Sequence, residues 1–495
     1  MPLLSKSKLL AFRQCERRLW LELHRPELRH DDDGSQATFA AGHLVGELAR
    51  RLYDPQGLGV LLDAQSEGID TVLARSAALL DGAAPLFEAG FSADGALAFA
   101  DILLPAGSSG RWRMVEVKSS TSVKDYHLDD AAIQCFVARR AGIDLTGIAL
   151  AHIDSSWTYP GGGDYDGLLF EEDLTHKAFE RASEVASWIA RAHAVAALDA
   201  EPDIAPGAHC GSPNPCGFTG HCRGDGAAAE FPVQWLPQRS ARSLKQRIED
   251  GATDMREIPD ALLNDRQQRV KRHTLAGTTY FDAAGAAADL AACPLPACFI
   301  DFETIAFAVP AWRGTRPFQM IPFQFSVHRV DADGATTHQA FLDLSGDDPS
   351  RAFAEALVGA CAGAGPVFVY NAAFETARIA ELAARYPELA TRLAAINERV
   401  VDLLPIARKR YYHPGQQGSW SIKRVLPAIA PDLSYAQLDG VQDGGGAMQA
   451  YLEAIAPGTD AARKRQLAEQ LLDYCRLDTL AMVRLWEFFR GAPAN

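Results

Sequence analysis

The chain has no apolar run of 18 residues, and its N-terminus lacks the succession of basic, apolar and small residues that marks a signal peptide. These absences argue against a membrane-spanning helix and against secretion. Basic charge is also scarce, because 48 lysines and arginines face 63 aspartates and glutamates, for a formal net charge of −15. A uniformly basic surface for nucleic acid is therefore excluded. We expect a cytoplasmic protein with no membrane partner.

Cysteine is the next scarce residue, with nine in 495 residues. Their uneven spacing does not fit a secreted disulfide framework. Three of them, Cys210, Cys216 and Cys222, form a C-x5-C-x5-C run rich in Gly and Pro, and Cys15 is the natural fourth ligand. Four thiolates could hold Zn²⁺ or a [4Fe-4S] cluster, and a neighbouring histidine could instead complete a Cys₃His zinc site. The spacing leaves these choices open.

A length of 495 residues predicts two or three domains, and 48% hydrophobic residues suffice for sizeable cores. We expect an α/β protein with an N-terminal domain over residues 1–225, a helical and locally basic connector over 226–295, and a C-terminal domain over 296–495. The basic residues of the connector could follow a DNA backbone, or they could form an ordinary solvated helix face.

Acidic residues recur at the ends of the elements expected in the C-terminal domain. A short buried strand carries Asp301 and Glu303, which period-2 alternation places on one face. A following helix carries Glu375 in its first turn, and a later helix carries Tyr474 and Asp478 four residues apart. Four carboxylates from one strand and two helices can therefore converge on a hard cation.

This ordered set resembles the DEDD exonucleases of the ribonuclease-H-like fold, over about residues 295–490. The resemblance implies that Asp301, Glu303, Glu375 and Asp478 hold two Mg²⁺ or Mn²⁺ ions, and that Tyr474 orients the attacking water. Asp402 has a supporting role in this scheme. One departure is that Glu375 stands where the family usually has aspartate.

The N-terminal domain shows three expected strands, over about 86–91, 96–104 and 112–118, followed by a helix over about 129–141. The second strand carries Asp101, and the third carries Glu116 and Lys118. This arrangement resembles PD-(D/E)XK nucleases of the restriction-endonuclease-like fold. Asp101 and Glu116 would then bind Mg²⁺ or Mn²⁺, and Lys118 would orient or deprotonate the nucleophile. His43, on a preceding helix, is a further candidate metal ligand.

The chain opening around Cys15, the nuclease-like core and the three distal cysteines together are similar to iron–sulfur RecB-type nucleases, including the CRISPR adaptation exonuclease family. The resemblance covers about residues 1–225 and implies that Cys15, Cys210, Cys216 and Cys222 hold a [4Fe-4S] cluster rather than zinc. Glu88 is a weaker companion of the catalytic set. The family's Q-x-x-x-Y motif is incomplete here, because Gln134 is followed by Ala138.

An aromatic and basic segment, Tyr411 to Arg424, lies between the second and third acidic motifs of the C-terminal domain. It could stack on a base and hold a phosphate, or it could be a flexible loop. Its Ser421 and Lys423 are expected to open a helix.

The two resemblances predict a metal-dependent DNA exonuclease that acts on single-stranded DNA or DNA ends, in repair or in defence against foreign DNA. Two alternatives remain: an RNA-processing 3′–5′ exonuclease, and a nucleic-acid clamp in which one domain has lost its chemistry.

Overall fold

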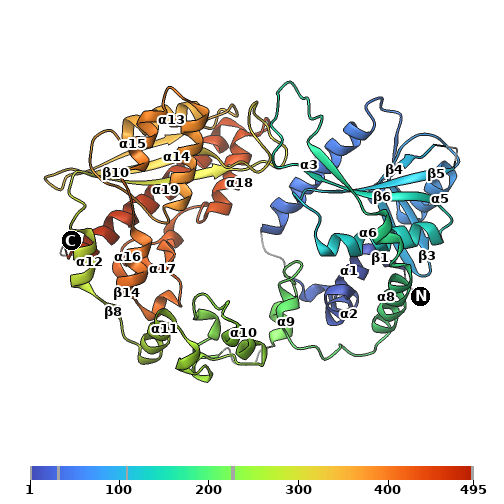
Figure 1. The fold of residues 1–495 in the computed structure, drawn as a ribbon, viewed down its shortest axis with the longest axis horizontal. Helices are drawn as coiled ribbons and strands as arrows, with labels where there is room; N and C mark the ends of the chain where they lie inside the picture. The colour runs from blue at the N-terminus through green and yellow to red at the C-terminus, as the bar shows by residue number, and fades with distance from the viewer. Residues whose placement is uncertain (1–2, 31–33, 108–109, 225–228, 492–495) are drawn as a thin grey trace. The chain divides into compact units, whose positions relative to one another are not determined.

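The computed structural model describes residues 3–30, 34–107, 110–224 and 229–491, without the side chains of residues 34–40. The chain forms two compact units (Figure 1). Unit 1 consists of Met1–Gly226 and Phe307–Phe318, and unit 2 of Ala227–Ala306 and Gln319–Asn495. The segment expected as a separate connector thus groups with unit 2, and its expected boundary at residue 225 lies outside the described residues. Each unit is α/β, with helices around a mixed sheet.

Unit 1 contains the three predicted strands and the helix that follows them, as β3, β4, β5 and α6, among other elements. Its elements are β1 (Leu4–Ser5), α1 (Lys6–Gln14), α2 (Glu16–His24), α3 (Gly34–Tyr53), β2 (Val60–Leu61), α4 (Ala64–Glu67), α5 (Ile69–Leu79), β3 (Leu86–Ala93), β4 (Ala96–Pro105), β5 (Arg111–Lys118), α6 (Asp125–Arg140), β6 (Asp144–Ile153), β7 (Leu169–Asp173), α7 (Thr175–Phe179), α8 (Ala182–Ala196) and α9 (Thr219–Arg223).

The unit 1 sheet runs in the order β2-β3-β4-β5-β6-β7, and β1 adds to β4. The central β5 is antiparallel to β4 and parallel to β6. Side chains alternate between the faces: Met114 belongs to the core shared with α6, whereas Val115 packs in the cluster that includes Ala49 of α3. Figure 1 shows α3 and α6 on opposite sides of this sheet. The same alternation sends Glu116 and Lys118 to the α6 face.

A hairpin-like excursion, Phe307–Phe318, completes unit 1. Its base is closed by the Phe318 amide, which donates to the Phe307 carbonyl at 2.7 Å. Ala308 and Val309 join a small apolar core with residues of α3 and β6. Backbone hydrogen bonds in both directions between Tyr159 and the excursion, at 2.8 and 2.9 Å, hold it in place. Sequence reasoning gave no sign of this excursion.

Unit 2 contains α10 (Arg242–Glu249), α11 (Asp265–Ala276), β8 (Tyr280–Phe281), α12 (Ala283–Leu290), β9 (Ala297–Ile305), β10 (Ile321–Val330), β11 (Thr336–Leu342), α13 (Ser350–Ala360), β12 (Val367–Val369), α14 (Ala373–Arg385), α15 (Ala390–Asn397), β13 (Val400–Asp402), α16 (Leu403–Arg410), β14 (Tyr411–Tyr412), α17 (Ile422–Ile429), α18 (Gly444–Ile455) and α19 (Ala461–Arg490).

Its main sheet has the order β11-β10-β9-β12-β13. β10 is antiparallel to both neighbours, and β12 is parallel to β9 and β13. Ile300 and Phe302 of β9 pack in the core with α13, α14 and α15, whereas Phe299 meets Trp486 of α19 edge to face. Figure 1 shows α13 to α15 on one side of the sheet and α19 on the other. Asp301 and Glu303 therefore belong to the α19 face.

Two local expectations need correction. The apolar residues on both sides of Cys15 have helical spacing and predict one helix with Cys15 in its middle, but Cys15 is extended (φ −165°, ψ 126°) and separates α1 from α2. Tyr411, Tyr412 and Trp420 were candidates for stacking on a base, but they are only 3%, 0% and 5% exposed. Apolar burial has taken these rings into the core, because they pack against neighbouring aromatic side chains instead of facing solvent.

None of the helices in the described part of the chain has both the length and the apolar character needed to cross a bilayer.

Candidate active sites and a cysteine cradle

The acidic residues predicted in unit 2 come together at one pocket of about 280 Å³. β9 contributes two of them, the first turn of α14 contributes one, and α19 contributes the fourth together with the tyrosine. All five predicted residues line the pocket: Asp301, Glu303, Glu375, Tyr474 and Asp478.

The turn from β12 into α14 places Glu375. Asn371 has a left-handed backbone (φ 85°), a conformation that asparagine tolerates better than most residues. Asp402, at the end of β13, accepts the amides of Asn371 at 2.9 Å and Ala372 at 3.0 Å, and it also caps α16 through the Leu404 amide at 2.9 Å. One carboxylate therefore fixes the turn and orients the helix that carries Glu375.

Burial and mutual repulsion make these carboxyls poor anions in the absence of a cation. Burial, with Asp478 and Glu303 nearby, raises the pKa of Asp301 well above its ordinary range. Burial, reinforced by Asp478, raises the pKa of Glu303 to about 8. Burial raises the pKa of Glu375 to about 8 and that of Asp478 to about 6. Clustered, desolvated carboxyls of this kind are stabilised when a cation binds between them.

One carboxylate oxygen of this pocket has no protein partner. Glu375 is only 3% exposed, and its Oε2 forms no hydrogen bond. A buried acceptor without a partner is costly, and a bound cation or hydrogen-bond donor would relieve that cost. Glutamate in place of the usual aspartate therefore still delivers its carboxyl to the pocket.

Three further side chains lie near this pocket, and of these only Lys423 belongs to a segment that the sequence suggested could hold a phosphate. The Tyr435 hydroxyl donates to Asp478 Oδ1 at 2.5 Å, and the Lys423 ammonium lies 4.8 Å from the centre of the Tyr474 ring. Cys475 offers a sulfur within 4.8 Å of ligand atoms of Asp301 and Glu303, in one group that could hold a metal ion. Burial raises the pKa of its thiol well above the ordinary value. Only its place beside Tyr474 on an acidic helix could have singled it out.

The residues predicted for the unit 1 site, Asp101, Glu116 and Lys118, lie close together where the pairing of β4 with β5 ends. The last antiparallel pair is Ile102 with Val115, so the same register sets Asp101 opposite Glu116. Asp101 Oδ2 accepts the Val117 amide at 2.8 Å, and Lys118 Nζ donates to Glu116 Oε1 at 2.6 Å. Burial, then the charge of Glu116, raises the pKa of Asp101 to about 8.

Three further residues complete this polar cluster. Lys6 Nζ lies 2.9 Å from Glu116 Oε1 and 3.1 Å from Asp130 Oδ1, because β1 pairs with β4 and leads directly into α1. Asp130, on α6, also accepts from Lys118 at 2.8 Å. Gln134 Nε2 donates to Glu116 Oε2 at 2.6 Å, and its own Oε1 is buried without a partner. The retained glutamine of the incomplete motif thus fixes the central carboxylate.

The electrostatics of this cluster are balanced by the two ammonium groups. Burial alone would lower the pKa of Lys118, but Asp130 and Glu116 hold it well above its ordinary value. Burial would raise the pKa of Asp130, but Lys118 and Lys6 hold it below its usual range. The side chains of Lys6, Lys118 and Asp130 are each at most a quarter exposed.

His43 and Glu88 lie at the margin of this cluster. His43 is exposed on α3, close enough to Glu88 to favour its charged form. Glu88 has a left-handed backbone (φ 56°), and burial followed by repulsion from Glu116 raises its pKa. No hydrogen bond within the described residues ties either side chain to Asp101 or Glu116.

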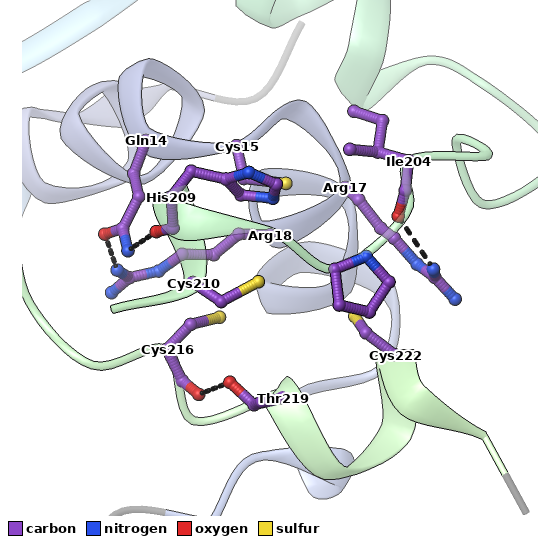
Figure 2. A pocket seen from close by; sticks show the side chains of 11 residues that line it. Gln14, Cys15, Arg17, Arg18, Ile204, His209, Cys210, Cys216, Thr219 and Cys222 are labelled. Carbon is purple, nitrogen blue, oxygen red and sulfur yellow. Dashed lines mark hydrogen bonds between the residues drawn. The ribbon is translucent and has the colours of Figure 1, made fainter. Parts of the chain in front are cut away.

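The four predicted cysteines line one small hollow in unit 1 (Figure 2). Cys15 enters from the break between α1 and α2, and Cys210, Cys216 and Cys222 enter from the distal loop and α9. Figure 2 shows their sulfur atoms directed into the space between these segments. Gln14 fixes the loop by donating to the carbonyls of His209 at 2.7 Å and Asn214 at 2.8 Å.

The donor set fits a group held by four thiolates. All four thiols are free, and each is partly exposed. Tetrahedral zinc with four Zn–S bonds of about 2.3 Å requires sulfurs about 3.8 Å apart. Among the described residues, no three of these sulfurs lie within 4.8 Å of one another. The four thiolate donors suit either Zn²⁺ or a [4Fe-4S] cluster.

A comparison with family models matches residues 298–421 to a domain of unknown function, DUF2779. The match includes Asp301, Glu303 and Glu375 and ends before Tyr474 and Asp478. A comparison with curated proteins gives no match.

Proposed function

We propose that this chain is a metal-dependent nuclease that hydrolyses phosphodiester bonds from DNA strand ends, with one active site in each unit. The proposal assigns a ribonuclease-H-like, DEDD-type fold to unit 2 and a PD-(D/E)XK fold to unit 1. The observation that carries it is the convergence of four carboxyls and Tyr474 on one pocket, with a buried Glu375 oxygen that lacks a protein partner.

In the unit 2 site, Asp301, Glu303, Glu375 and Asp478 would hold Mg²⁺ or Mn²⁺, which supplies Lewis acidity and a more acidic bound water. Tyr474 would orient the attacking water, because its ring lies on the same helix face as Asp478. Tyr435 holds Asp478 in one rotamer through its hydroxyl. Lys423, near the Tyr474 ring, would offset negative charge on the scissile phosphate.

In the unit 1 site, Asp101 and Glu116 are the proposed metal ligands, and His43 is a further candidate. The Nζ of Lys118 already donates to two carboxylates, so it is better suited to hold a phosphate oxygen or water than to accept a proton. Gln134 and Lys6 position Glu116. We propose a [4Fe-4S] cluster on the four cysteines as a structural tie between the chain opening and the distal loop.

The test uses end-labelled single-stranded DNA and RNA with Mg²⁺ or Mn²⁺, and compares the wild type with Asp301→Asn, Glu116→Gln and the double variant. Both substitutions are close to isosteric, so the fold is retained while a ligand charge is lost. We expect each single variant to retain one activity, with its own product ladder, and the double variant to be inactive. Glu398→Gln, an exposed site on the surface of unit 2, is the matched control.

DNA left intact by every form would overturn the proposal. Degradation of RNA alone would favour the RNA-processing alternative. If one single variant keeps full activity and the other has none, only the unit mutated in the inactive variant is a nuclease. The other unit, whose substitution has no effect, would then be a nucleic-acid clamp.

A further inference from the structure

A second hollow, of about 630 Å³, adjoins the carboxylate pocket of unit 2. The two share four lining residues, so they form one continuous depression. The shared residues are Tyr370, Asn371, Ser421 and Ile422. The outer hollow is closed by Pro237 and Gln238 of the segment that precedes the main sheet, and by α11 and α16.

The outer hollow is positively charged. Arg266 of α11 and Arg408 of α16 are its only charged lining residues, and no carboxylate lines it. In the described part of the chain, neither guanidinium forms an ion pair, and the Arg266 contact is a 3.5 Å hydrogen bond to Gln238. Burial, together with Arg408 and Arg269, lowers the pKa of Arg266. Arg266 is half-buried and Arg408 is exposed, and an anion bound between these like charges would relieve their repulsion.

Further donors face the same place. α17 begins at the junction of the two hollows, with Ser421 as its N-cap and no side-chain cap bond. The first backbone hydrogen bonds of this helix come from Arg424 and Val425, so the amides of Ile422 and Lys423 have no helical acceptor. A helix N-terminus favours a negatively charged ligand. It therefore adds to the attraction of the arginine pair.

We infer that this outer hollow binds a backbone phosphate of the same polynucleotide strand whose scissile phosphate lies in the carboxylate pocket. The inference rests on the proposed function of that pocket and adds a subsite to it. Arginine suits this role because its planar fork can donate two hydrogen bonds to one phosphate. Phosphate contact carries no base information, so the subsite serves DNA and RNA strands of any sequence.

Packing contacts hold the segment before the sheet, which forms one wall of the outer hollow, in unit 2. Gln267 of α11 donates to the carbonyls of Pro237 at 2.8 Å and Gln238 at 3.2 Å, which ties the wall of the hollow to the helix that carries Arg266. Gly418 lies against the Trp235 carbonyl so closely that a Cβ there would be 1.5 Å from the oxygen. The wall is thus packed firmly onto the catalytic part.

The experiment compares Arg266→Gln/Arg408→Gln with Arg392→Gln, an exposed arginine on α15 outside both hollows. All carry Glu116→Gln to silence unit 1. Binding of a fluorescein-labelled single-stranded oligonucleotide is titrated with salt, in an added Asp301→Asn background. The slope of log affinity against log salt should be shallower by about 0.7 for the double variant, since that is the contribution of one phosphate contact on a single strand. The Arg392→Gln control should keep the parent slope.

Cleavage supplies the second readout. The value of kcat/KM is measured for the oligonucleotide and for the p-nitrophenyl ester of thymidine 5′-phosphate, which is too short to fill both hollows. The first value divided by the second should fall about tenfold in the double variant. An unchanged salt slope, or equal losses on both substrates, would overturn the inference. A protein that cleaves neither substrate but shows the reduced slope would refute the proposed catalysis while supporting the phosphate subsite.

Discussion

Glu375→Gln should stabilise the metal-free protein near pH 8 even though it removes a proposed metal ligand. Glu375 is 3% exposed, and burial raises its pKa to about 8 from an ordinary value of 4.5. Between these pH values the folded chain keeps a proton that the unfolded chain has lost. Wild-type stability therefore falls as the pH rises, by about 1.4 kcal/mol for each pH unit.

The pH-dependent part of this effect is large. From about pH 5 to about pH 8 the ionisation of Glu375 removes about 3.5 kcal/mol of wild-type stability, and about 2.5 kcal/mol of this is lost by pH 7. Glutamine stays neutral, so the variant lacks this loss. Its buried amide without a partner costs about 1–3 kcal/mol at every pH. The variant should therefore be less stable than the wild type near pH 5 and more stable near pH 8.

The assay is urea unfolding in the presence of EDTA, followed by circular dichroism at several pH values. The difference in unfolding free energy between variant and wild type should change sign as the pH rises. Added Mn²⁺ should stabilise the wild type most at high pH, because the ion then meets ionised carboxylates, and should stabilise the variant less. A difference that is the same at all pH values would refute the reasoning, as would an equal effect from the exposed Glu398→Gln.

Three further outcomes are expected. Lys6→Met should cost about 3 kcal/mol of unfolding free energy without metal, because it leaves two buried carboxylates with one fewer counter-charge, and Mg²⁺ should restore part of the loss. Cys15→Ser should lower bound iron in anaerobically purified protein and its visible absorption, whereas Cys293→Ser, in unit 2, should retain both. Asp402→Ala should cost about 1–2 kcal/mol and lower kcat on unit 2 substrates, whereas equal kcat would show that its hydrogen bonds do not position the site.

Short-range periodicity predicted the parts of the site that lie on one element. Strand alternation placed Asp301 and Glu303 on one face, and helical spacing placed Tyr474 and Asp478 together; the structure brings all four to one pocket. The α/β class, and the three strands and following helix at the centre of unit 1, followed from the same patterns. These regularities depend only on neighbours within a few residues, so one sequence suffices to read them.

Contacts between distant segments could not be predicted in this way. Lys6 reaches Glu116 across 110 residues because β1 pairs with β4, and a two-residue strand has no detectable periodicity. Tyr435 reaches Asp478 from a short turn with no acidic motif around it. The extended backbone at Cys15 breaks a pattern that is apolar at helical spacing on both sides. In each case tertiary pairing, rather than local preference, determines the position.

The excursion Phe307–Phe318 affects the order in which the protein can be completed during synthesis. Unit 1 lacks Ala308 and Val309 of its small core until the ribosome has passed residue 318, and by then the chain of unit 2 has already begun with Ala227–Ala306. During synthesis, the apolar surface of unit 1 that Ala308 and Val309 later cover therefore stays exposed. A gene fragment that stops at residue 226 would preserve this unfinished state, so separate expression of the units requires the excursion to be grafted back.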